Sequence, residues 1–341
     1  MDLRRVTGLV ALALALWLAL ALLNHPAPAA PPVNFDSSNR CAECHPAVFD
    51  EWKSSWHARS WDDPDVRALS NDFANTDCID CHAPRPVFST GVGKRVLPRA
   101  ARRSEGVDCI ACHLIRDADT GAPGVAGTID RPGAACRPRA MLDLQRPDYC
   151  GVCHDQHKTV RQWRASSWAE RGIGCIDCHM PLRNDDPNQG RDHSCRGGHD
   201  LELVRSAVEL RGKRDPQNPL NWVLEVENVG AGHHFPTDER SRAADLFWRP
   251  LVAVGATNAD DAQPGPWRHL YRFRDPYRHE TDIPATHLAA GETRRVSLGE
   301  EEARAGAEVA LFYKLTPYYE NPDHPDPERE ARLVHSLTLK P

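Results

Sequence analysis

The chain has 341 residues, which is enough for two modest domains with separate cores. Its formal net charge of −6 is small and negative, so the composition gives no sign of a nucleic-acid partner. Only 7% of the residues are aromatic, while 28 Pro and 22 Gly indicate many turns and few long helices.

The N-terminus is typical of an export signal. Arg4 and Arg5 precede a long apolar run, and Ala-Pro-Ala at 27–29 provides an A-x-A cleavage site. We therefore expect residues 1–29 to be a signal peptide. The apolar run is also about as long as the shortest membrane spans, so an uncleaved anchor is the alternative. Both alternatives predict a periplasmic or extracellular protein.

Ten of the 12 cysteines occur in five copies of the pattern C-x-x-C-H. This pattern attaches c-type haem: the two thiols bind the macrocycle, and the following His is the proximal ligand of the iron. Zinc sites and disulfides would not require a His after each pair. We expect five covalently bound haem c groups. The predicted thioether residues are Cys41, Cys44, Cys78, Cys81, Cys109, Cys112, Cys150, Cys153, Cys175 and Cys178, and the predicted proximal ligands are His45, His82, His113, His154 and His179.

Five motifs within residues 41–179 leave too little polypeptide for an ordinary apolar core. We therefore expect a mostly irregular and helical domain at 38–200, in which the haems form the core and lie close together. Residues 41–82 and 150–179 look like two copies of one segment, with the third motif in an inserted segment. Residues 114–149 are expected to be an irregular loop.

The second axial position of each iron can be closed by a side chain or left open for a small molecule. Only two methionines lie beyond the apolar run, whereas histidines are plentiful, so bis-His ligation is the default expectation. The candidate distal ligands are His57, His157, His193, His199 and His233, with His234 as the alternative to His233. The other histidines, His269, His279, His287, His324 and His335, are expected to be solvated or packed.

One copy of the repeated segment lacks its histidine. His57 in "EWKSSWHARS" is aligned with Ala169 in "QWRASSWAER". We therefore expect the haem of the fourth motif to take its distal ligand from outside its own copy, with His233 as the first choice. His157, a neighbouring subunit or an open iron are the alternatives.

Two cysteines lie outside the motifs. A disulfide between Cys136 and Cys195 is the simplest expectation in an oxidising compartment, and a single thioether at Cys195 is the alternative.

The sequence changes character near residue 200. Residues 201–341 contain no cysteine and several short runs rich in β-formers, among them "LELVRSAVEL", "NWVLEVENV" and "VALFYKL". We expect an antiparallel β-sandwich here.

Over roughly residues 38–245 the sequence resembles multihaem c-type cytochromes related to the tetrahaem cytochrome of ammonia oxidation. The resemblance is carried by "CAECHPAVFDEWKSSWHARS", "GIGCIDCHMPL", "HSCRGGHD" and "NVGAGHHFPT". It implies low-potential bis-His haems and electron transfer outside the inner membrane. It also favours His57, His193 and His233 as distal ligands.

Two functions compete at this stage. The first is an electron-transfer protein whose partners are other redox proteins, such as a quinol-oxidising cytochrome, a terminal reductase or an outer-membrane complex. The second is a reductase of a small nitrogen compound with one open iron. No Lys follows a cysteine pair, so the C-x-x-C-K haem of the known nitrite-reducing kind is absent, which favours electron transfer. Self-assembly into an oligomer or filament through the β-domain is compatible with either.

Overall fold

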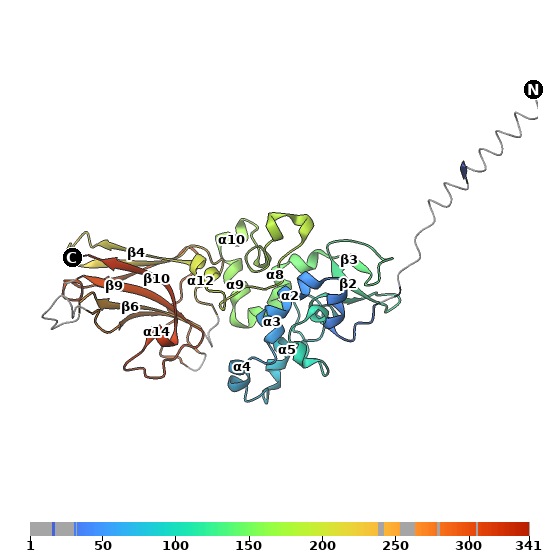
Figure 1. Cartoon of the computed structure of the whole chain (residues 1–341), viewed down its shortest axis with the longest axis horizontal. Coiled ribbons are helices and arrows are strands. Elements are labelled where there is room, and N and C mark those ends of the chain that lie inside the picture. Colours follow the sequence, from blue (N-terminus) through green and yellow to red (C-terminus); the bar gives the residue numbers. More distant parts are fainter. Residues whose placement is uncertain are drawn as a thin grey trace, which may run out of the picture.

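The computed structural model describes residues 16–17, 31, 33–237, 242–252, 263–277, 280–304 and 306–340. The expected signal peptide, apart from two residues, and His279 lie outside these ranges. No helix in the described ranges is long and apolar enough to cross a membrane. Figure 1 shows two lobes, a helical lobe that ends near residue 200 and a β lobe that contains the C-terminal end.

The helical lobe consists of short helices, none longer than the nine residues of α2 (Pro46–Ser54). Its buried apolar side chains form only small clusters, such as Phe73, Ile79 and Ala83. Protein side chains alone therefore provide little core, as expected where haems fill the interior. The other helices of this lobe are η1 (Ser38–Glu43), α3 (Trp56–Arg59), α4 (Pro64–Leu69), η2 (Thr76–Cys78), α5 (Ile79–His82), α6 (Val87–Thr90), η3 (Arg103–Glu105), α7 (Cys109–His113), η4 (Leu142–Gln145), α8 (Pro147–His154), η5 (Asp155–His157), α9 (Thr159–Arg164), α10 (Ser167–Glu170), α11 (Cys175–His179), η6 (Arg183–Asp185) and η7 (Pro187–Gln189).

The segment expected to be an irregular loop contains a small sheet, so that expectation was wrong. Strands β1 (Leu114–Arg116) and β2 (Pro123–Gly127) are antiparallel, and β3 (Pro138–Ala140) pairs with β2 in parallel. The strands are only three to five residues long, too short for a clear alternation in sequence.

The run "LELVRSAVEL" divides into a helix and a strand. Asp200 caps α12 (Leu201–Ala207) by accepting hydrogen bonds from the backbone N–H groups of Glu202 and Leu203. The strand β4 starts only at Val208. The expectation of a strand over the whole run was wrong in its first half, where an N-cap and good helix formers decide the structure.

The β lobe is an antiparallel sandwich, and the predicted fold class is confirmed. One sheet has the order β10-β9-β6-β7 and the other β4-β5-β8. Core residues of both sheets form one cluster, with Leu246 opposite Leu311 in the first and Leu224 opposite Val296 in the second. The elements are β4 (Val208–Arg214), β5 (Trp222–Asn228), β6 (Ala243–Pro250), β7 (Arg268–Phe273), β8 (Thr293–Leu298), α13 (Glu300–Ala303), β9 (Ala307–Lys314), α14 (Pro327–Glu330) and β10 (Arg332–Leu339).

One carboxylate is fully buried in the sandwich. Asp245 on β6 accepts hydrogen bonds from Arg272 Nε (2.7 Å), His269 Nε2 (3.1 Å) and the Tyr319 hydroxyl (3.1 Å). Burial by itself would raise the pKa of Asp245, but the bonds from His269 and Arg272 outweigh it and lower that pKa. The charge is therefore retained inside the domain by its partners.

Candidate haem-binding site

Each haem motif lies on a short helical turn. The spacing of C-x-x-C-H places its three reactive side chains at i, i+3 and i+4, on one face of such a turn. The third motif occupies the whole of α7, which is capped by the Asp108 carboxylate on the Ala111 N–H (2.7 Å). The fifth motif occupies α11, where Asp177 bonds back to the Gly174 N–H (2.8 Å). The helix ends thus fix the orientation of these motifs.

Three motif histidines each face a second imidazole. The ring centres of His57 and His154 are 6.0 Å apart, those of His113 and His193 6.1 Å, and those of His179 and His233 6.2 Å. With metal–nitrogen bonds of about 2 Å, a metal held between two opposite imidazoles sets their ring centres roughly 6 Å apart. The spacing of all three pairs therefore fits a haem iron between the rings.

Backbone carbonyls orient five of the imidazoles through Nδ1. His82 contacts Ser60 O (2.9 Å) and His113 contacts Ala126 O (2.8 Å). A bond to a carbonyl puts the proton on Nδ1 and leaves the Nε2 lone pair for a metal. The same bond is made by His179 to Arg196 O (2.5 Å), His193 to Arg191 O (2.8 Å) and His233 to His234 O (2.9 Å).

Burial favours the neutral form of four of the paired imidazoles, the form that metal ligation requires. It lowers the pKa of His57 and of His233 to about 4, and neighbouring imidazoles add to the shift. Burial also lowers the pKa of His113 and of His193. The residues present therefore fit haem c, which when bound supplies the redox-active iron.

The pairs differ from the pairing expected from the sequence. His154 of the fourth motif faces His57, and His233 faces His179 of the fifth motif. The sequence predicted that His233 would pair with the fourth motif, whereas in the structure it faces the fifth. The part that agrees is that the fourth motif is paired from outside its own segment, and that the loop of the β lobe after β5 reaches a motif histidine.

The other two distal candidates are placed differently. His199 stacks on Trp56 with ring centres 3.6 Å apart, and its Nε2 lies 3.2 Å from Arg242 Nη2. This ring is engaged with the domain junction rather than with a motif histidine. His157 lies in η5, directly after the fourth motif, and remains a predicted ligand. His234, the alternative to His233, packs against His287 at 4.2 Å.

Thiols of different motifs contact one another. Cys41 lies within hydrogen-bond distance of Cys109, Cys81 of Cys153, and Cys150 of Cys175. Cys112 is also close enough to Cys150 to contribute to the raised pKa of Cys150. Each of these thiols would be bonded to the edge of a haem, so the haem edges meet at these points. The contacts join the first motif to the third, and the fourth motif to the second and fifth, while Cys112 brings the third motif near the fourth.

The expected disulfide is absent from the described residues, where Cys136 and Cys195 are both free thiols. Cys195 instead lies near Cys112. The pKa of Cys112 is raised mainly by burial, and the nearby Cys195 thiol adds to the increase. Burial raises the pKa of the Cys195 thiol itself to about 12. The sequence could not show that the loop carrying His193 brings Cys195 to a haem motif.

The repeat is also arranged differently from the sequence alignment. The indole of Trp52 donates to Val107 O (2.8 Å), two residues before the third motif. The indole of Trp163 donates to Ile173 O (2.9 Å), two residues before the fifth motif. The first and third motifs therefore correspond to the fourth and fifth, and the second motif, not the third, is the inserted one.

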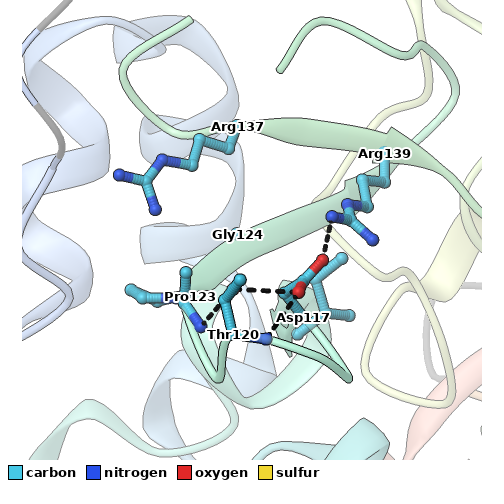
Figure 2. A pocket seen from close by; sticks show the side chains of 8 residues that line it. Asp117, Thr120, Pro123, Gly124, Arg137 and Arg139 are labelled. Atoms are coloured by element: carbon cyan, nitrogen blue, oxygen red, sulfur yellow. Dashed lines mark hydrogen bonds and ion pairs between the residues drawn. The ribbon is translucent and has the colours of Figure 1, made fainter. Parts of the chain in front are cut away.

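Two pockets lie away from the motifs. Figure 2 shows a pocket of about 270 Å³ against the small sheet, where Asp117 accepts hydrogen bonds from Thr120 and Arg139. Another, of about 870 Å³, lies in the β lobe around Trp267 and Tyr318. No motif cysteine or histidine lines either pocket, so neither is a haem site.

The five motifs and the imidazole pairs define a c-type cytochrome with several haems, and covalent haem c is its cofactor. In these features the chain is similar to the multihaem c-type cytochromes, which transfer electrons. Residues 40–114 match the family "Cytochrome c554 and c-prime". The fold is similar to that of a "penta-heme cytochrome c552 from Thermochromatium tepidum", with a TM-score of 0.63 and 20% identity over 89% of this chain and 98% of that one. The sequence matches no curated protein.

Proposed function

We propose that the protein conducts electrons outside the inner membrane through five covalently bound haem c groups, at least three of them closed by two histidines. The observation that carries this proposal is the set of imidazole pairs with ring centres 6.0, 6.1 and 6.2 Å apart. An iron closed on both sides exchanges electrons but has no position for a substrate. The export-like N-terminus supports the location.

Contact between thiols of different motifs supports rapid transfer between haems. The contact of Cys153 with Cys81 would bring the fourth haem close to the second, and the contact of Cys150 with Cys175 would bring it close to the fifth. The first haem would reach the third through Cys41 and Cys109. Electrons then enter and leave through other redox proteins, which are the partners that a chain of closed haems requires.

Mass spectrometry of the mature chain tests the haem count, with five covalent haems expected and four or fewer contradicting the proposal. A low-temperature EPR spectrum of the oxidised protein tests the axial ligands. Low-spin signals for the three paired haems support the proposal. The reductase alternative gains support if the protein also turns over nitrite or hydroxylamine with a reduced electron donor.

A further inference from the structure

Each half of the helical lobe has a hydrogen-bond acceptor at the equivalent position of its helix. Glu51 on α2 and Gln162 on α9 each stand directly before a tryptophan that anchors a later motif, the third and the fifth respectively. Both side chains carry an oxygen that accepts hydrogen bonds, and both point to loops that come from much later in the chain. Figure 1 places α2 in the middle of the helical lobe and α9 at its junction with the β lobe.

Glu51 holds the loop of His193. Its Oε2 accepts the backbone N–H of His193 at 2.9 Å, although the two residues are 142 positions apart. Arg183 binds the same carboxylate with both Nε (2.7 Å) and Nη2. Both side chains are largely covered, with exposed fractions of 25% for Glu51 and 22% for Arg183. A charge-assisted, two-pronged contact of this kind is among the stronger hydrogen-bonded arrangements in proteins.

Gln162 holds the loop of His233. Its Oε1 lies 3.2 Å from the backbone N of His234 and 3.3 Å from the Thr237 hydroxyl, and both donate to it. The carbonyl of the same residue, His234, is the group that orients the His233 ring. Gly232, just before this pair, packs so closely on Trp163 that an added Cβ would lie 3.2 Å from the indole. The loop is thus fixed against α9 from both ends of the histidine pair.

We infer that Glu51 and Gln162 are positioning residues that hold the distal imidazoles His193 and His233 opposite His113 and His179. The inference rests on the axial ligation proposed above. A distal ligand on a long loop dissociates unless its backbone is fixed, because each freed backbone bond of the loop adds conformational entropy to the detached state. The helix that follows the first motif thus helps to close the haem of the third, and the helix that follows the fourth helps to close that of the fifth.

The test uses the full-length holoprotein and measures how much carbon monoxide the reduced protein binds per chain, together with the EPR spin state of the oxidised form. His193→Ala serves as the reference for a fully open third haem. Losing a hydrogen bond to a charged group shifts an equilibrium at least about 10-fold. We therefore expect Glu51→Ala to raise the detached fraction of His193 at least about 10-fold, seen as extra carbon monoxide uptake and a high-spin signal.

The matched variants separate positioning from general damage. Glu51→Gln keeps an acceptor, as Gln162 does naturally, and is expected to restore most of the wild-type uptake. Gln162→Ala is expected to open the fifth haem in the same way. Glu320→Ala removes an exposed partner of Arg329 in the β lobe and is expected to change nothing. If Glu51→Ala yields no holoprotein, Glu51→Asp, whose shorter side chain withdraws the acceptor, is expected to give the same increase.

Two outcomes would overturn different claims. If His193→Ala opens a haem but neither Glu51→Ala nor Glu51→Asp takes up more carbon monoxide than the wild type, the positioning role is wrong and the ligand assignment stands. If His193→Ala itself opens no haem, the proposed axial pair is wrong.

Discussion

Replacing His57 tests the most unexpected pair. His57 follows the first motif in the chain, but its ring faces His154 of the fourth motif at 6.0 Å. The variant His57→Ala removes one of the two imidazoles from that iron. We expect the fourth haem to become high-spin and to bind carbon monoxide when reduced, because an iron that loses one of two axial imidazoles has an open sixth position.

The size of the effect follows from the pairing. His57 and His233 face different motif histidines, so each variant is expected to open one haem and the double variant His57→Ala/His233→Ala two. Independent sites of this kind contribute additively. The expected uptake above the wild type is therefore about one carbon monoxide per chain for each single variant and about two for the double variant.

The assay is titration of the reduced holoprotein with carbon monoxide, followed by its absorption spectrum, with His324→Ala as the control. His324 is exposed in a loop of the β lobe and is expected to behave as the wild type. If the double variant opened no more haem than one single variant, both histidines would belong to the same iron, and the assignment of separate pairs would be refuted. An unchanged spectrum for His57→Ala would remove His57 from the ligands.

Three further predictions concern the β lobe. Asp245→Ala should lower the free energy of unfolding by about 1–3 kcal/mol at neutral pH, because it leaves the partly buried cation of Arg272 without its carboxylate. Since the pKa of Asp245 is lowered on folding, its contribution is complete above the ordinary carboxyl range and is lost as the pH falls below about 4, so the Tm values of variant and wild type should converge there. Asn228→Ala should lower the free energy of unfolding by about 1–3 kcal/mol and loosen the His233 loop, because the Asn228 side chain donates to His233 O (2.8 Å). Thermal unfolding measures the first effect and carbon monoxide uptake the second, and an unchanged Tm would contradict the first. Gly230→Ala should lower the free energy of unfolding by about 1–3 kcal/mol or more, because the new Cβ would lie 2.2 Å from a backbone oxygen. As a control, Gly133→Ala adds a Cβ that meets nothing within 4 Å and should leave the denaturant titration unchanged.

Local patterns predicted the parts of the site that depend on neighbouring residues. The C-x-x-C-H spacing is read within one helical turn, and glycines beside His233 marked a loop that approaches another group closely. The sandwich followed from short β-rich runs. His199 carried a local signal similar to that of His193, in the same Gly-rich stretch, but its ring stacks on Trp56. Sequence alone offered no means of separating the two.

What the sequence could not predict is which segments meet. The alignment of the two copies rested on Ser-Ser-Trp and placed the third motif in an insert, whereas the contacts of Trp52 and Trp163 pair the third motif with the fifth. The alignment also made Ala169 look like a lost ligand. His57 of the first copy faces His154, the histidine of the motif with which the second copy begins. By the same arrangement, a histidine at position 169 would face the motif of a third copy, and the sequence contains no motif after residue 179. The puzzle of the missing histidine therefore has a structural answer.

The thiol contacts between motifs have a consequence for how current would flow. The three thiol contacts described above, with the proximity of Cys112 to Cys150, would link five haems in a branched tree whose junction is the fourth haem. Each pair of haems would then be connected by a single route, so an electron that passes from the first haem to the second or the fifth would cross the fourth. The throughput of the whole molecule is then limited by how quickly that one centre is emptied and refilled. The two imidazoles that face each other at this centre are His154 and His57, which comes from the segment after the first motif.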